Sequence, residues 1–360
     1  MRTATSSAGR GGSGGAFGSA IGRGRLPDWA PFGALCVAAA LVAASLLLMT
    51  MFSVALLFVG TVVLASVAIY AWSRSVEGAR QAKNRLVTVT IASAFALAVL
   101  PLISLLYTVM SKGLARFDGT FFTDSARNVV GEGGGAIHAV TGTLVITAVA
   151  TLISVPIGVM AAIYLHEYGR GRLRRALTFF VDVMTGIPSI VAGLFAFALF
   201  ALFFGPGIRL GVMGSVALSV LMIPIVIRST EEILKIVPNH LREASYALGT
   251  PKWRTITKVV LPTALAGLIT GVMLAVARVI GETAPLLVTT GVIDSTNADP
   301  FNGRMQNLAV YAFNEYKSPG VPPEASIDRA WAAALTLIAI VMLLSLMARL
   351  IYRRFGTEIR

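Results

Sequence analysis

Two charged side chains interrupt an otherwise apolar run in the last third of the chain. Arg278 and Glu282 lie within ARVIGETAPLL, after a long apolar stretch that starts near Val259. An ionised side chain at the middle of a bilayer costs about 2.5–3.5 kcal/mol on the insertion scale. A spacing of four residues places both groups on one side of a helix, which predicts a polar patch inside a membrane span. A buried ion pair that only fixes helix packing is the alternative that this spacing leaves open.

A second charged group combines Arg228 with Glu231 and Glu232, at positions i+3 and i+4. The group lies at the end of an apolar segment, so it fits either the transport pathway or the membrane interface. We keep Arg228 as a candidate pathway residue beside Arg278 and Glu282. Asp182, six residues before Pro188, is expected to be an interfacial partner of Arg174 or Arg175 more often than a functional group.

A polar stretch precedes the apolar run of Arg278. In it, Glu243 and Ala244 are followed by Gly249 and, further on, by Leu261 and Pro262. This order resembles the EAA loop of ABC importer permeases. The resemblance implies two short helices joined at the glycine, which dock onto a cytosolic ATPase and couple it to the spans. Ser245 departs from the pattern, because a second alanine is usual there. An ordinary cytosolic loop is the alternative.

The segment ARVIGETAPLL resembles the phosphate branch of the same family, the PstA-type permeases. That resemblance implies a permease subunit that moves inorganic phosphate across the bacterial cytoplasmic membrane by alternating access. It also implies its partners: a dimer of ATPase subunits, a second PstC-like permease and an extracytoplasmic phosphate-binding protein. The alternatives are a permease for another oxyanion or small solute and, in a different class, a membrane-embedded enzyme or a secondary carrier.

The pairing of an arginine with a carboxylate has a chemical meaning for phosphate. Arginine offers planar, permanently charged donors that match phosphate oxygens. A carboxylate can accept the proton that phosphate retains near neutral pH, whereas sulfate has no such proton and would be repelled. We therefore hypothesise that Glu282 helps to exclude fully deprotonated anions.

The composition places the chain in a membrane. It has 360 residues, of which 56% are hydrophobic and 13% charged, and its mean hydropathy is +0.79. A soluble core of this length could not bury so much apolar surface. The net charge of +13 lies in short basic clusters between apolar runs. That pattern favours positive loops at the cytosolic face over a nucleic-acid surface.

The apolar runs and basic clusters predict an all-α integral membrane protein with about eight transmembrane helices and both termini in the cytosol. The expected spans lie near residues 30–49, 53–72, 86–110, 137–165, 177–204, 211–234, from 259 to 287 or beyond, and 330–350. Each interval meets the requirement of about 20 residues for one crossing. The resemblance covers the last six spans, a type I, MetI-like permease core.

Three regions follow from this assignment. Residues 1–28 are rich in Gly, Ser and Arg and are expected to be a disordered cytosolic tail. Residues 29–73 form an extra transmembrane hairpin of unknown role. The permease domain covers residues 86–355 and includes the coupling loop at 239–262. The segment NLAVYAFNEY, before the last span, is expected to be an amphipathic piece on the surface.

The sequence lacks the motifs for nucleotide binding and for metal sites. No phosphate-binding loop of the type G-x-x-x-x-G-K-[ST] occurs in the sequence, so ATP is expected on a separate polypeptide and this chain is expected not to be an enzyme. Cys36 is the single cysteine, and the three histidines lie far apart in the sequence. We therefore expect no metal site and no bound cofactor.

Overall fold

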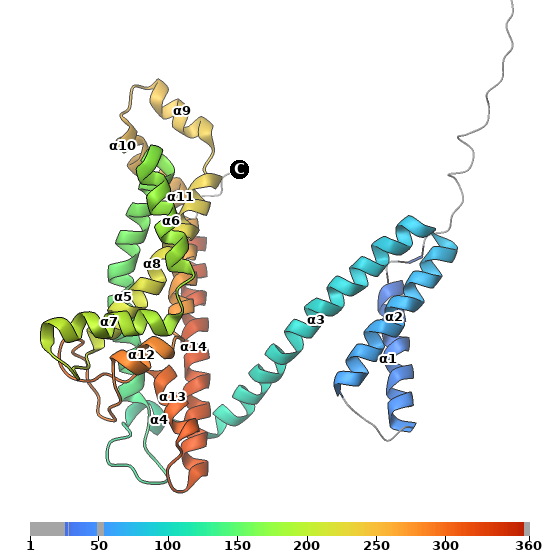
Figure 1. Cartoon of the computed structure of the whole chain (residues 1–360), viewed down its shortest axis with the longest axis horizontal. Coiled ribbons are helices and arrows are strands. Elements are labelled where there is room, and N and C mark those ends of the chain that lie inside the picture. Colours follow the sequence, from blue (N-terminus) through green and yellow to red (C-terminus); the bar gives the residue numbers. More distant parts are fainter. Residues whose placement is uncertain (1–25, 28, 49–53, 356–360) are drawn as a thin grey trace, which may run out of the picture. The chain divides into compact units, whose positions relative to one another are not determined.

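The computed structural model describes residues 26–27, 29–48 and 54–355, and all regular elements within them are helices (Figure 1). The chain divides into two compact units, Met1–Leu106 and Tyr107–Arg360. Seven helices of the described chain are long and apolar enough to cross a membrane, and a bent pair of helices makes an eighth candidate. The prediction of an all-α protein with about eight spans is confirmed. The expected tail lies outside the described residues, apart from Leu26 and Pro27.

The first unit contains the extra hairpin and most of the following helix. α1 (Ala30–Leu48) and α2 (Val54–Val76) occupy the two intervals expected for the hairpin, and α3 (Ala79–Gly113) follows. α3 begins seven residues before the expected span at Leu86, so the basic residues Arg80, Lys83 and Arg85 lie on the helix and not in a loop. Arginine, lysine and alanine are good helix formers, which explains the extension.

The turn between α2 and α3 is fixed by one carboxylate. Glu77 accepts hydrogen bonds from Arg85 at 2.6 and 2.8 Å, from the Ser73 hydroxyl at 2.7 Å and from the Leu26 amide at 2.8 Å. The hydrogen bond from Arg85 is the main reason why the pKa of Glu77 falls from its ordinary value of 4.5 to about 2. Gly78, with φ of +94°, completes the turn in a conformation that favours glycine.

The second unit is built around two parallel helices, α5 (Ile137–Ile163) and α8 (Gly211–Ile236). The hydroxyl of Ser215 donates to the carbonyl of Ile146 at 3.0 Å, and a Cβ on Gly158 would lie 2.7 Å from Val226. Both helices therefore run in the same direction from their N-terminal to their C-terminal ends. The intervening segment must carry the chain back from the far end of α5 to the start of α8.

That return is made by a sharply bent pair. α6 (Gly171–Thr185) and α7 (Ser189–Phe204) meet at an angle of 106°. The expected span over residues 177–204 is therefore broken and not one continuous helix, and the kink falls at the residues that suggested one. Gly186 ends α6, and Pro188 precedes α7 with an extended ψ of 137°, because proline and the residue before it disfavour a continuous helix.

The expected seventh span is also interrupted. α11 (Leu261–Val279) ends before Glu282, and the short α12 (Ala284–Thr289) follows after a turn. A span continuing beyond residue 287 is therefore wrong. α14 (Pro323–Phe355) contains the expected eighth span and starts seven residues earlier than predicted. In Figure 1, α7 and α12 both lie across the direction of α8 and α14.

α13 (Leu308–Lys317) corresponds to the segment expected on the surface, and that expectation is wrong. Leu308, Val310 and Tyr311 are buried, and α13 packs against α14. Val310 belongs to the main apolar core, together with residues of α5, α8 and α11. The expectation failed because the polar residues of the segment lie toward its end, whereas its first turn is apolar.

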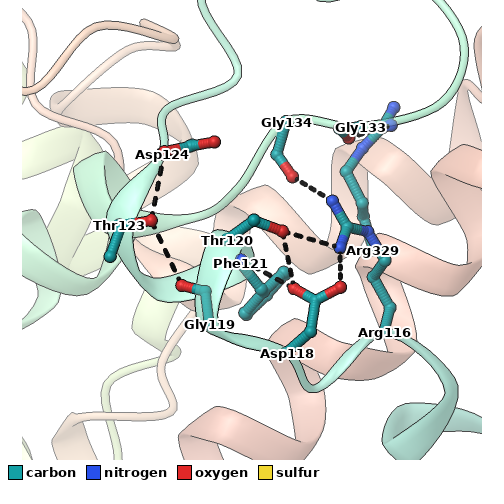
Figure 2. A network of polar contacts seen from close by, with 10 residues as sticks. All are labelled: Arg116, Asp118, Gly119, Thr120, Phe121, Thr123, Asp124, Gly133, Gly134 and Arg329. Atoms are coloured by element: carbon teal, nitrogen blue, oxygen red, sulfur yellow. Dashed lines mark hydrogen bonds and ion pairs between the residues drawn. The ribbon is translucent and has the colours of Figure 1, made fainter.

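The end of the second unit opposite α9 and α10 is held by arginine contacts to loop carbonyls (Figure 2). Arg116, in the 3₁₀ turn η1 (Leu114–Arg116), pairs with Asp118 and donates to the Gly134 carbonyl at 2.7 Å. Asp118 caps α4 (Gly119–Thr123) by accepting from the Phe121 amide at 2.8 Å, and this bond lowers the pKa of Asp118. Arg329 donates to the Gly133 carbonyl at 3.2 Å.

Candidate transport pathway and coupling loop

The polar stretch before α11 forms two short helices joined at a glycine, as the resemblance implied. α9 (Asn239–Ala247) and α10 (Lys252–Thr255) are separated by a turn in which Gly249 has φ of +75°. This conformation suits glycine because it is strained for residues with a Cβ. The two helices form the tip of the second unit beyond α8 (Figure 1).

The residues proposed for coupling lie where a partner could reach most of them. Glu243, Ala244 and Gly249 are exposed, and no other atom lies within 4 Å of a Cβ added to Gly249. Leu261 and Pro262 form the first turn of α11, where Leu261 is half-buried and Pro262 is exposed. These two residues directly follow the π-helical turn at residues 256–260, within the continuous helix Lys252–Val279. The roles of these five residues stay a prediction.

Ser245, the departure from the usual pattern, links the two short helices. Its hydroxyl lies 2.9 Å from the hydroxyl of Thr255 on α10 and 2.6 Å from that of Thr250 in the turn. The Thr250 hydroxyl also donates to the backbone carbonyl of Ser245. An alanine could not make these contacts. The serine is buried, so the hydroxyls satisfy each other without water.

Two residues that the sequence argument did not single out anchor this loop. Arg242 on α9 is 9% exposed and forms an ion pair with Glu167, 75 residues earlier in the chain. Glu167 lies in η2 (Tyr164–Tyr168), a turn of π-helix that continues α5. No local sequence pattern points to this pair, because only the fold brings the ends of α5 and α8 together.

Arg228 is already paired within this chain. On α8, it donates to Glu231 at 2.9 Å and forms an ion pair with Asp182 of α6. The expectation that Asp182 pairs with Arg174 or Arg175 is therefore wrong, because Asp182 lies opposite α8. The i+3 contact to Glu231 was apparent from the spacing, whereas the contact to α6 needed the fold. Among the described residues, Arg228 forms no hydrogen bond or ion pair with Glu282.

Arg278 and Glu282 do not form the one-turn pair that their spacing suggested. α11 ends at Val279, and the amide of Glu282 donates to the Val279 carbonyl at 3.1 Å in the turn that follows. Neither side chain has a hydrogen bond or ion pair with another described residue. Arg278 is exposed and Glu282 is half-buried. The packing-only alternative, a buried ion pair between these two residues, is thus not formed.

The break after α11 is held in place by a close crossing of two helices. A Cβ on Gly193 of α7 would lie 2.6 Å from Cα and 2.9 Å from the carbonyl oxygen of Pro285 on α12. Only glycine allows the backbones to approach so closely. Ala275 and Val276, three and two residues before Arg278, pack in the main core with Ile146 and Leu218. The unpaired arginine therefore stands beside the core of the bundle, at the end of an interrupted helix.

An interrupted bundle of apolar helices with a projecting helical loop is the architecture of a membrane permease. The chain belongs to the family of binding-protein-dependent transport system inner membrane components, which matches residues 154–360. It is thus a multi-pass inner-membrane subunit of a transport system. The alternatives of a membrane-embedded enzyme and a secondary carrier are excluded by this membership.

Relatives agree with this assignment, and a solved structure shares the fold. The chain is 44% identical over 275 residues to the phosphate transport system permease protein PstA 1 of Mycobacterium tuberculosis strain H37Rv, covering 76% of this chain and 88% of the relative. It is 37% identical over 285 residues to PstA of Yersinia pestis, covering 78% and 94%. A chain of the crystal structure of a bacterial alginate ABC transporter superimposes with a TM-score of 0.56 at 12% identity, covering 76% and 96%. The last likeness concerns the fold alone.

Proposed function

We propose that this protein is the permease subunit of an ATP-driven importer of inorganic phosphate. One observation carries the proposal: relatives whose names specify phosphate transport align with most of this chain and with nearly their own full length. The chain works by alternating access, and it binds no cofactor itself. Both termini and the loop at Gly249 face the cytosol, as the basic clusters indicate.

Partner proteins supply what this chain lacks. A dimer of ATPase subunits docks on the exposed tip formed by α9 and α10, and a binding protein delivers phosphate from outside. A second, PstC-like permease faces the surface that contains Arg278. This placement follows from energetics, because an exposed guanidinium in a span is costly against lipid but not against a partner or a water-filled path.

Arg278 binds phosphate during translocation in this proposal, and the interrupted helix supports the role. Transporters place their substrate sites where membrane helices are discontinuous, because such breaks free polar groups inside the membrane. The guanidinium has no partner among the described residues, so its five N–H groups remain available to oxyanion oxygens. Arg228, held by two carboxylates, lines the cytosolic part of the path and is occupied until a substrate competes for it.

Reconstitution of the complete complex in liposomes tests the proposed substrate. We expect ATP hydrolysis and uptake to rise with phosphate and phosphate-loaded binding protein, and to stay at their basal rates with sulfate. Stimulation by sulfate or another solute, with none by phosphate, would favour the alternative of a permease for a different substrate.

The hypothesis for Glu282 has its own test within the same assay. Replacing the carboxylate in Glu282→Gln removes both the proton acceptor and the repulsion of a fully deprotonated anion. We expect the ratio of phosphate to sulfate uptake to fall, provided that the binding protein is omitted or saturated equally with both anions. An unchanged ratio would remove this role from Glu282.

A further inference from the structure

The guanidinium of Arg242 joins the end of α8 and the start of α9 to η2, which lies 75 residues earlier in the chain. It donates to one oxygen of Glu167 from Nε at 3.2 Å and from Nη2 at 2.9 Å. It also donates to the carbonyls of Val237 at 2.8 Å and Leu234 at 3.1 Å, at the end of α8. A fifth bond reaches Asn239 at 3.1 Å. The last carbonyls of a helix lack partners within the helix, so a single side chain closes α8 and ties it to α9 and η2.

The second short helix is tied to the same π-helical turn. Lys252 of α10 donates to the backbone carbonyl of Glu167, and its ammonium group lies 4.9 Å from the centre of the Tyr168 ring. Both helices of the loop thus hold η2, one through the side chain of Glu167 and the other through its backbone. α9, with nine residues, is too short to keep its shape alone, so its contacts must supply the rigidity, whereas α10 is the first turn of a continuous helix that runs to Val279.

The anchored ends lead directly into the two central helices of the second unit. η2 continues α5, and the carbonyls that Arg242 closes belong to α8 and its C-terminal end. α5 and α8 are joined along their length by the bonds from Ser215 to Ile146 at 3.0 Å and from Ser219 to Ala150 at 3.4 Å. A displacement of the tip is therefore passed to both helices together.

We propose that Arg242 and Glu167 form a positioning latch that transmits movement of the coupling loop to α5 and α8. The inference rests on the proposed function, because it names how the ATPase partner acts on this chain. Neither residue touches the substrate or the ATPase in this account. Both are buried, with side-chain exposures of 11% and 7%, so breaking one leaves the other an uncompensated charge.

The amount of substrate moved for each ATP hydrolysed distinguishes a positioning role of Arg242 and Glu167 from a role in protein stability alone. In the reconstituted complex we expect Arg242→Ala to lower this ratio about fivefold or more, the range of a typical coupling between two sites. Glu167→Gln keeps the side-chain shape and should lower it less, and the double variant should be no worse than Arg242→Ala alone. Lys235→Ala, which removes an exposed charge near Leu234 with no ion pair among the described residues, is the control and should keep the native ratio.

A purely structural role would reduce the yield of assembled complex and leave the ratio unchanged, and that result would overturn the proposal. Hydrogen exchange on the isolated permease gives a second measurement. Arg242→Ala should speed exchange in residues 164–168 and 239–247 together, whereas Lys235→Ala should not. Unchanged exchange at residues 164–168 would also overturn the latch. If the native complex fails to take up phosphate, the proposed function fails, but the exchange result still decides whether the latch exists.

Discussion

The arginines of this protein differ in how their charge is satisfied. Arg242 and Arg329 are buried and donate to carboxylates and backbone carbonyls, as buried charges require. Arg278 lies in an apolar helix without a partner among the described residues. The structural arginines thus have their donors in use inside the chain, whereas the donors of Arg278 are available to a substrate.

The Glu77 carboxylate should make the stability of the first unit depend on pH in the acidic range. Its pKa is about 2 in the folded protein and 4.5 ordinarily, so its contribution is complete above pH 4.5 and is lost as the pH falls through 2. We expect Glu77→Gln to cost about 1–3 kcal/mol of local unfolding free energy near pH 7. Hydrogen exchange at residues 73–85, compared between native and variant at each pH, measures this difference.

The difference should shrink as the pH approaches 2, because the protonated native carboxyl then resembles the amide. Glu132→Gln, at an exposed residue outside this unit, should have no effect at any pH. An equal difference at both ends of the pH range would contradict the assigned role of Glu77.

At the scale of elements, the sequence indicated where helices lie more reliably than where they break. The apolar runs located all the spans, but the runs of residues 177–204 and 259–287 are each divided in the structure. Gly186 and Pro188 signalled the first break. The second has Gly281 and Pro285 as local signals, and the crossing of Gly193 over Pro285 that accompanies it involves a distant element.

That crossing can be tested with glycine substitutions. Gly193→Ala places a methyl group 2.6 Å from the Cα of Pro285, so α7 and α12 must separate. We expect a loss of about 1–3 kcal/mol in stability, because neither backbone can yield easily. Gly119→Ala is the control, since its added Cβ meets no atom within 4 Å. Thermal unfolding in nanodiscs compares the two, and equal stability would show that the close approach is not required.

The turn between α9 and α10 makes a second prediction at this scale. Gly249→Val forces a β-branched residue into a positive φ of +75° at an exposed site, which strains the turn by about 1–2 kcal/mol without a clash elsewhere. We expect normal membrane insertion but loss of ATP-coupled uptake. Gly249→Asn should keep most of the activity, because asparagine tolerates this conformation. Native uptake by Gly249→Val would remove the turn from the coupling mechanism.

At the scale of the whole molecule, composition and charge were sufficient to predict a polytopic helical protein. Hydropathy located the spans, because each must cover the bilayer, and basic clusters indicated which loops face the cytosol. The ion pairs between distant elements, such as Arg228 with Asp182 and Arg242 with Glu167, could not be predicted. They depend on which helices are neighbours, and hydropathy carries no information about that.

The orientation of the permease in the membrane is testable by labelling. In a Cys36→Ser background, a cysteine at Gly249 should react with an impermeant maleimide only when the reagent has access to the cytosolic side of the membrane. A cysteine at Val130, a residue that is 89% exposed, should react in intact cells. The reverse pattern would invert the proposed topology, and with it the assignment of the α9–α10 tip to the ATPase.

Substitution of Arg278 tests the central claim most directly. Initial phosphate uptake should be compared in cells that produce native protein, Arg278→Ala, Arg278→Lys or the control Lys235→Ala, at equal amounts of inserted complex with bound ATPase. We expect Arg278→Ala to lower uptake about tenfold or more, since a charged hydrogen-bonding group is worth about 1.5–3 kcal/mol, and Arg278→Lys to lower it less. Uptake at the native rate in Arg278→Ala cells would contradict the account.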